Sequence, residues 1–164
     1  IPSISTSPRT LISTETDTLT NNGTVNAFVA KFNNDGKIVW AKTAGGNNGE
    51  GPATATREFF VDQNGDTYCT GSNWSEFQFA EQTIKTVAGS EDIFLLKYDK
   101  DGNEIWGVDY GGSGRNAGRG ITVDKKGHVL LTGSFDEKQL QIADQILTNA
   151  GDADIFIIKF GDPK

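Results

Sequence analysis

The chain holds a single histidine, His128, so catalysis is the first chemistry to consider. A histidine that acts as a general base needs an orienting carboxylate and a nucleophile arranged around it. No motif in the sequence supplies either group. A glycoside hydrolase or lyase would need paired carboxylates on one face, and most acidic residues here fall in expected turns. We therefore interpret His128 as a solvated turn residue and expect no catalytic residues and no enzyme.

A second candidate is the run of carboxylate and amide side chains over Asp99–Glu104, DKDGNE. Such oxygens suit calcium, but the twelve-residue loop with a terminal bidentate glutamate is missing. The related segment 33–37 places Lys37 where a ligand would lie. Hairpin chemistry explains both segments without a metal. We expect no metal and no cofactor, although the sequence leaves calcium binding at Asp99–Glu104 open.

The three tryptophans form a third group of candidates. Trp40 and Trp106 occupy the same position in two related segments, where packing between repeats is expected and sugar stacking is the alternative. Trp74 follows Asn73 in an expected connector, and its counterpart Asp136 is not aromatic. An aromatic side chain that is not repeated has less structural reason to be there. Trp74 and Asn73 are therefore the candidate ligand-binding residues, with packing under the connector as the alternative.

An internal repeat accounts for most of the chain. Residues 27–46 and 93–112 are identical at seven of twenty positions, at an offset of 66 residues. Residues 59–72 match residues 121–134 at an offset of 62, and the segment IFLLKY at 93–98 returns as IFIIKF at 155–160. The change in offset falls in the Gly-rich connectors 47–58 and 113–120, as expected of surface loops. The sequence therefore predicts one complete repeat between two partial ones.

Each repeat reads as four short strands. In the complete repeat we expect them at 58–62, 66–72, 92–99 and 103–110, with turns of the type D-x-x-G after the first and third strands. The third strand is a continuous apolar run, so both of its faces should be buried. The fourth strand carries charge at both ends, as an outer strand would. Four-stranded antiparallel sheets that cover each other's faces are the blades of a β-propeller.

These motifs carry a resemblance to a known family. They are GITVDKKGHVLLTGS at 120–134, DIFLLKY at 92–98, DGNEIW at 101–106 and the closing Gly111-Gly112 pair. Together they resemble the bacterial β-propeller repeat family called SBBP, for seven-bladed bacterial propeller. The family pattern places Asn after the turn glycine, where this chain has Asp66 and His128. The resemblance implies a structural or interaction module, with an adhesive role, in a secreted or surface-attached bacterial protein.

Net charge, hydrophobic segments and cysteine content limit the kinds of partner and location that we expect. The net charge of −7 argues against nucleic acid, which needs a Lys/Arg surface. No segment resembles a signal peptide or a membrane span, so we expect no membrane insertion. If the protein is exported, this sequence is its mature form. The lone Cys69 rules out an internal disulfide and is expected to be a small buried hydrophobe. A carbohydrate-binding propeller lectin is the alternative function, and a glycan-active enzyme ranks below it.

The predicted organisation is one continuous propeller-like domain. It comprises a partial blade at 1–46, a complete blade at 47–112 and a partial blade at 113–164. Because propellers close with four to eight blades, the expected partners are other blades. Those blades come either from the same parent chain or from further copies of this chain, and protein or glycan ligands are the other expected partners.

Overall fold

The computed structural model describes residues 9–13, 18–21, 26–44, 54–87 and 89–161. Every helix or strand element in these segments is a β-strand, which confirms the all-β prediction. The strands are β1 (Arg9–Ser13), β2 (Thr18–Asn21), β3 (Ala27–Phe32), β4 (Ile38–Ala44), β5 (Ala55–Val61), β6 (Thr67–Asn73), β7 (Phe77–Phe79), β8 (Gln82–Ile84), β9 (Asp92–Tyr98), β10 (Glu104–Tyr110), β11 (Asn116–Val123), β12 (Val129–Phe135), β13 (Gln139–Ile142), β14 (Gln145–Thr148) and β15 (Asp154–Phe160).

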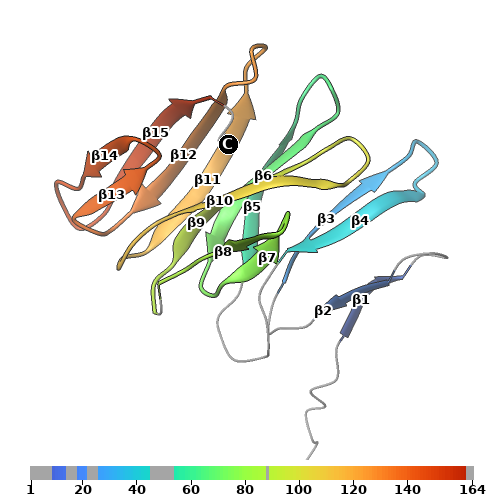
Figure 1. Cartoon of the computed structure of the whole chain (residues 1–164), viewed down its shortest axis with the longest axis horizontal. Helices are drawn as coiled ribbons and strands as arrows, with labels where there is room; N and C mark the ends of the chain where they lie inside the picture. The colour runs from blue at the N-terminus through green and yellow to red at the C-terminus, as the bar shows by residue number, and fades with distance from the viewer. Residues whose placement is uncertain (1–8, 14–17, 22–25, 45–53, 88, 162–164) are drawn as a thin grey trace, which may run out of the picture.

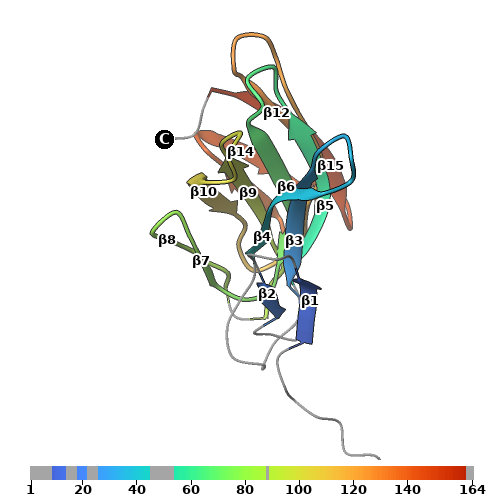
Figure 2. The same ribbon diagram turned by 90° about the vertical axis from the view of Figure 1, so that its right-hand side faces the viewer.

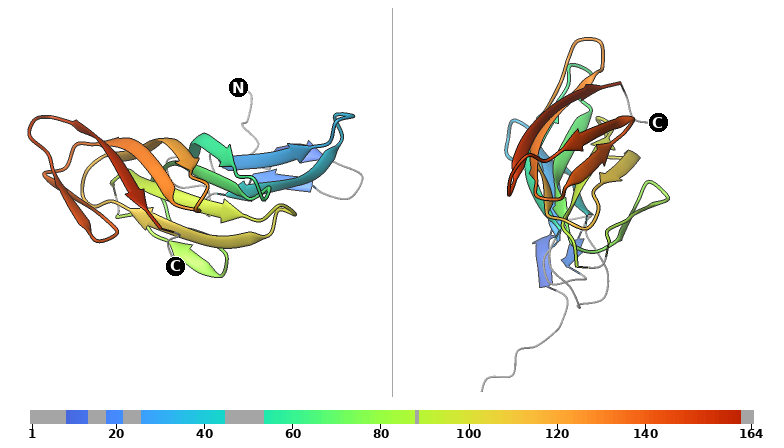
Figure 3. Two further views of the ribbon diagram at one scale, coloured as in Figure 1. Left: turned by 90° about the horizontal axis from the view of Figure 1, so that it is seen from above. Right: turned by 90° about the vertical axis from the view of Figure 1, so that its left-hand side faces the viewer.

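Three of the sheets form successive blades. Blade 2 is a four-stranded antiparallel sheet in the order β10-β9-β6-β5, so β10 is an edge strand as the sequence predicts. Blade 3 has the order β11-β12-β15, and blade 1 is the pair β3-β4. The blades follow one another side by side in chain order (Figures 1 and 3), and β11 runs alongside β5 and β6 of the preceding blade.

One turn design recurs between the paired strands. In the turn between β9 and β10, the Asp99 side chain accepts hydrogen bonds from the backbone N–H groups of Asp101 and Asn103, at 2.9 and 2.8 Å. Gly102 then adopts a φ of 83°, in the left-handed region that favours glycine. In the other three turns, the side chains of Asn33, Asp62 and Asp124 accept the same pair of hydrogen bonds from the backbone N–H groups two and four residues later. The D-x-x-G motif is therefore a local hydrogen-bond pattern that sets each hairpin.

The connectors are shorter than the sequence predicts. Strand β5 begins at Ala55 and β11 at Asn116, inside segments expected to be loops. Both strands contain a β-bulge, at Arg57 and Arg119, which lets pairing continue past the irregularity. The connection between β6 and β9 contains the β7–β8 hairpin, which lies to one side of blade 2 (Figure 2), and β13–β14 takes the same place before β15. Sequence reasoning missed these hairpins because their strands are only three or four residues long.

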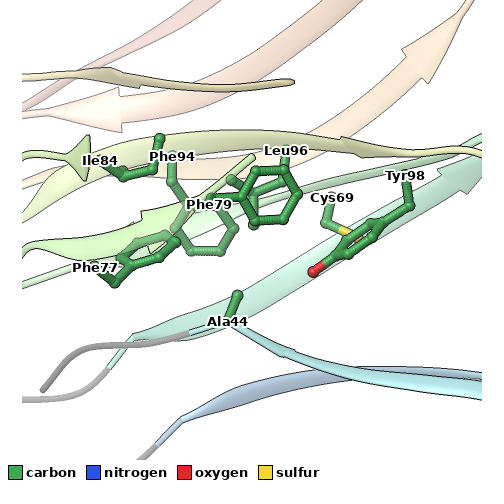
Figure 4. Close-up of a cluster of buried hydrophobic side chains, with 8 residues drawn as sticks. All are labelled: Ala44, Cys69, Phe77, Phe79, Ile84, Phe94, Leu96 and Tyr98. Carbon is green, nitrogen blue, oxygen red and sulfur yellow. The ribbon is translucent and has the colours of Figure 1, made fainter. Parts of the chain in front are cut away.

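The cores lie between blades as well as under the hairpins. A cluster between blades 1 and 2 gathers Phe side chains of β7 and β9 and an isoleucine of β8 around the end of β4 (Figure 4). It comprises Ala44, Cys69, Phe77, Phe79, Ile84, Phe94, Leu96 and Tyr98. Two further clusters join blade 2 to blade 3. Strand β9 is buried almost throughout, as its apolar run predicts. Cys69 is buried and its thiol pKa is raised to about 12 by desolvation, which confirms the expected small core residue.

Candidate interaction surface

The predicted ligand residues Asn73 and Trp74 lie at the end of β6. The Asn73 side chain is completely buried and its amide donates to the carbonyl oxygens of Ser75 and Lys85, both at 3.4 Å, and to the Thr86 hydroxyl. It therefore braces the connector that carries β7 and β8. Trp74 is half-buried in the bend before β7. The structure gives Asn73 a bracing role that the sequence did not indicate, and ligand binding by the pair stays a prediction.

The two repeated tryptophans pack between blades, which confirms the expectation for them. Trp106 is buried with Tyr68 and Leu95 of blade 2 and Ile121 of blade 3. Trp40 lies over Tyr98 with ring centroids 6.1 Å apart, and its indole N–H donates to the Lys100 carbonyl at 3.2 Å. Both tryptophans are buried, with exposures of 6% and 7%.

His128 pairs with a carboxylate that the sequence did not single out. Its Nδ1 lies 2.9 Å from Asp124 Oδ2, and the Lys159 ammonium donates to the same oxygen at 2.6 Å. The hydrogen bond from Lys159, followed by that from His128, holds the pKa of Asp124 well below its usual range. Because the group is solvent-exposed, it forms a surface ion-pair network at the start of β12. The half-exposed ring agrees with a solvated turn residue.

Protein donors already use the oxygens of the segment Asp99–Glu104. Asp99 accepts two backbone N–H groups on one oxygen and the Asn103 amide on the other, at 2.8 Å. The hydrogen bonds from Asn103 lower the pKa of Asp99. Asp101 pairs with Lys100, and Glu104 accepts the backbone N–H of Ala80. Across the described ranges, no group of three or more His, Cys, Asp or Glu side chains is placed to hold a metal ion.

The most distinctive surface of the chain is apolar and lies at its two ends. Comparison of equivalent positions in the three blades defines this surface. The strand pairing fixes the equivalence, because Gly71 of β6 lies opposite Phe94 of β9 as Gly133 of β12 lies opposite Phe156 of β15. The apolar side chains of β9 are buried on both faces of the sheet, whereas one face of β3, with Phe28 and Phe32, and one face of β15, with Ile155 and Ile157, are exposed. The exposed ends are therefore blade-to-blade surfaces against which no described strand packs.

We name the side of blade 1 that points away from blade 2 the leading face, formed by Phe28 and Phe32. Their side chains are 52% and 55% exposed, whereas their counterparts Phe94 and Tyr98 are completely buried. We name the opposite side of blade 3 the trailing face, formed by Ile155 and Ile157. These side chains are 86% and 76% exposed, and their counterparts Ile93 and Leu95 are completely buried.

An apolar groove lies where blade 1 meets the first strand of blade 2. It has a volume of about 520 Å³, and β3 forms one wall along its whole length. Exposed apolar side chains of β5, Phe59 and Val61, form the other wall. Lys31 lines the groove and donates to the Lys100 carbonyl of the neighbouring turn at 2.9 Å. The full lining is Phe28, Val29, Ala30, Lys31, Phe32, Trp40, Thr56, Phe59, Val61, Gly65 and Thr67.

Comparison of blades shows what such a groove accepts. In blade 2, β6 pairs with β9 along seven residues, and in blade 3 β12 pairs with β15 in the same way. Strand β3 pairs with β4, and no described strand pairs with its other edge, which borders the groove. The groove therefore has the shape and polarity of a slot for an extended strand, with backbone donors and acceptors on one wall and apolar side chains on both.

Fold and surface together place the chain among repeat proteins built from propeller-like blades. No known protein-family model matches the chain. A 59-residue segment, 36% of the chain, is 36% identical to an uncharacterized WD repeat-containing protein of Acanthamoeba polyphaga mimivirus. This segment spans 4% of that protein's length. No helix among the described residues is long and apolar enough to span a membrane.

Proposed function

We propose that this chain is a non-catalytic protein-interaction module of the bacterial propeller repeat type, carried by an exported or cell-surface protein. The observation that carries the proposal is the apolar groove beside the free edge of β3. Soluble monomers rarely expose contiguous apolar surface unless it binds something. The similarity to a WD repeat-containing protein, limited to 59 residues, and the resemblance of the turn and strand motifs to bacterial propeller repeats agree with a repeat module.

The partner of the groove is an extended polypeptide strand. Main-chain hydrogen bonds to the β3 edge would supply affinity, and apolar side chains at alternate positions would fill the space against Phe59 and Val61. The second strand of the repeat suits this slot. In blade 3, Val129, Leu131 and Phe135 of β12 lie on the same side of the sheet as Phe156 and Ile158. A copy of β12 that pairs with β3 in this register would place them beside Phe28 and Phe32 and turn Leu130 toward Phe59 and Val61.

A peptide with the sequence of residues 128–135, HVLLTGSF, tests this proposal. We expect the fluorescein-labelled peptide to bind the full chain, read by fluorescence anisotropy, and to change the emission of Trp40, which lines the groove. The double variant Phe59→Ser/Val61→Ser should weaken binding roughly tenfold or more, since it removes apolar contact from one wall.

The matched control is Val39→Ser, because Val39 is similarly exposed but does not line the groove. Its affinity for the peptide should equal that of the unmodified chain. Equal binding of a scrambled peptide, or no binding of HVLLTGSF to a folded sample, would contradict strand capture in the groove.

A further inference from the structure

The trailing and leading faces are the two halves of an interface that already exists inside the chain. Between blades 2 and 3, Ile93 packs in one buried cluster with Phe156 and Ile158. The trailing-face residue Ile155 is the repeat counterpart of Ile93, and the leading-face residue Phe28 is the counterpart of Phe156. One side of the internal contact is thus repeated on the outside of blade 3, and the other side on the outside of blade 1.

We propose that copies of this chain associate head to tail, with the trailing face of one copy packed on the leading face of the next. In this arrangement Ile155 meets Phe28 of the second copy as Ile93 meets Phe156 within the chain. The contact is heterologous, because different surfaces of the two copies meet, and successive copies continue the order of blades. The inference goes beyond strand capture, since the groove takes a single strand and this contact joins whole sheets.

Burial supports a sheet-on-sheet contact for these side chains. Ile155 and Ile157 project from β15, and their counterparts on β9 become inaccessible to water as soon as a neighbouring blade is present. Burial of these two isoleucines in a contact would favour association. The same holds for Phe28 and Phe32, which are about half-exposed where their counterparts are covered. A second copy supplies the complementary surface for both faces at once.

The net charge of the chain affects the strength of this association. Each copy carries −7, so two copies repel each other at low ionic strength. Because the proposed contact is apolar, added salt screens the repulsion without removing the attraction. Association should therefore become stronger as the salt concentration rises, which is the opposite of the behaviour of a contact built on opposite charges.

Sedimentation velocity over a wide concentration range tests the proposal. We expect the full chain to form dimers or larger assemblies with increasing concentration. The trailing-face variant Ile155→Glu/Ile157→Glu and the leading-face variant Phe28→Glu/Phe32→Glu should each weaken association at least roughly tenfold, because each places unpaired carboxylates in the contact. The control Ile105→Glu changes an exposed apolar residue on the outer strand of blade 2 and should associate like the unmodified chain.

Mixing the two variants separates head-to-tail association from other modes. Each variant keeps one intact face, so an equimolar mixture should form a heterodimer, and only a dimer, through the two intact faces. Circular dichroism and urea midpoints confirm beforehand that both variants are folded. A trailing-face variant that still associates by itself, or a mixture that stays monomeric while the unmodified chain associates, would overturn the arrangement.

Disulfide trapping provides a second readout at residue level. A sample of Ile155→Cys mixed with a sample of Phe28→Cys should form a crosslinked dimer faster than either sample alone, while the buried Cys69 stays unreactive. A full chain that remains monomeric at every concentration and salt level refutes self-association and points to blades of a longer parent chain as the partners. Phe28 and Phe32 belong to both the leading face and the groove lining. The trailing-face variant leaves the groove intact and should bind the HVLLTGSF peptide like the unmodified chain, so failure of self-association and failure of strand capture remain distinguishable.

Discussion

Two substitutions at equivalent positions of the repeat test whether burial alone sets how much each side chain contributes to stability. Leu95 and Ile157 occupy equivalent places in blades 2 and 3, but Leu95 is completely buried and Ile157 is 76% exposed. Leu95→Ala removes a wholly buried side chain and leaves a cavity, which costs about 2–5 kcal/mol. Ile157→Ala removes a side chain of which about a quarter is covered. Its cost should be about 0.5 kcal/mol, a quarter of the roughly 2 kcal/mol for complete burial.

Urea unfolding followed by tryptophan fluorescence measures both costs at a concentration where the chain sediments as a monomer. With a denaturant slope of about 2 kcal/mol per molar urea, Leu95→Ala should lower the midpoint by about 1–2.5 M. Ile157→Ala should lower it by about 0.3 M on the same slope. If Leu95→Ala does not fold, the milder Leu95→Val keeps the comparison, with an expected cost of about 1 kcal/mol. Equal costs at the two positions would refute the account of the trailing face as an uncovered blade surface.

Three further predictions concern the turns and the core. Gly71→Ala should destabilise the fold by about 2 kcal/mol or more, because an added Cβ overlaps a carbonyl oxygen of β5, whereas Gly151→Ala has free space around it and should change the urea midpoint little. Asp124→Asn should lower the urea midpoint at pH 7. Because the pKa of Asp124 is depressed in the folded chain, its ionised form stabilises the fold above about pH 4, and this stabilisation is lost as the pH falls further. The midpoints of the variant and the unmodified chain should therefore converge in acid. Cys69 should react with a thiol reagent at pH 8 only after denaturant is added, because burial raises its pKa to about 12; rapid modification of the folded chain would contradict the core assignment.

Local chemistry made the strands and turns of this protein predictable from sequence. The turn that contains Asp99 and Gly102 needs only a carboxylate to accept nearby N–H groups and a glycine at positive φ. The four-strand repeat, the outer position of β10 and the burial of Trp106 followed from repetition and apolar pattern. The hairpins β7–β8 and β13–β14 were missed, because such short strands form only against the face of a sheet that is already in place.

The surface of the molecule was decided by the tertiary structure. Ile93 and Ile155 both begin the sequence Ile-Phe in equivalent strands, and no local signal distinguishes them. One is completely buried and the other is 86% exposed, because blade 3 covers the first and no strand in the described part of the chain covers the second. The groove beside β3 likewise depends on the spacing of two sheets that are separate in sequence. The sequence alone determined that this chain forms β-sheets with apolar side chains on both faces. The arrangement of the sheets in space determined which of these faces are buried and which are exposed.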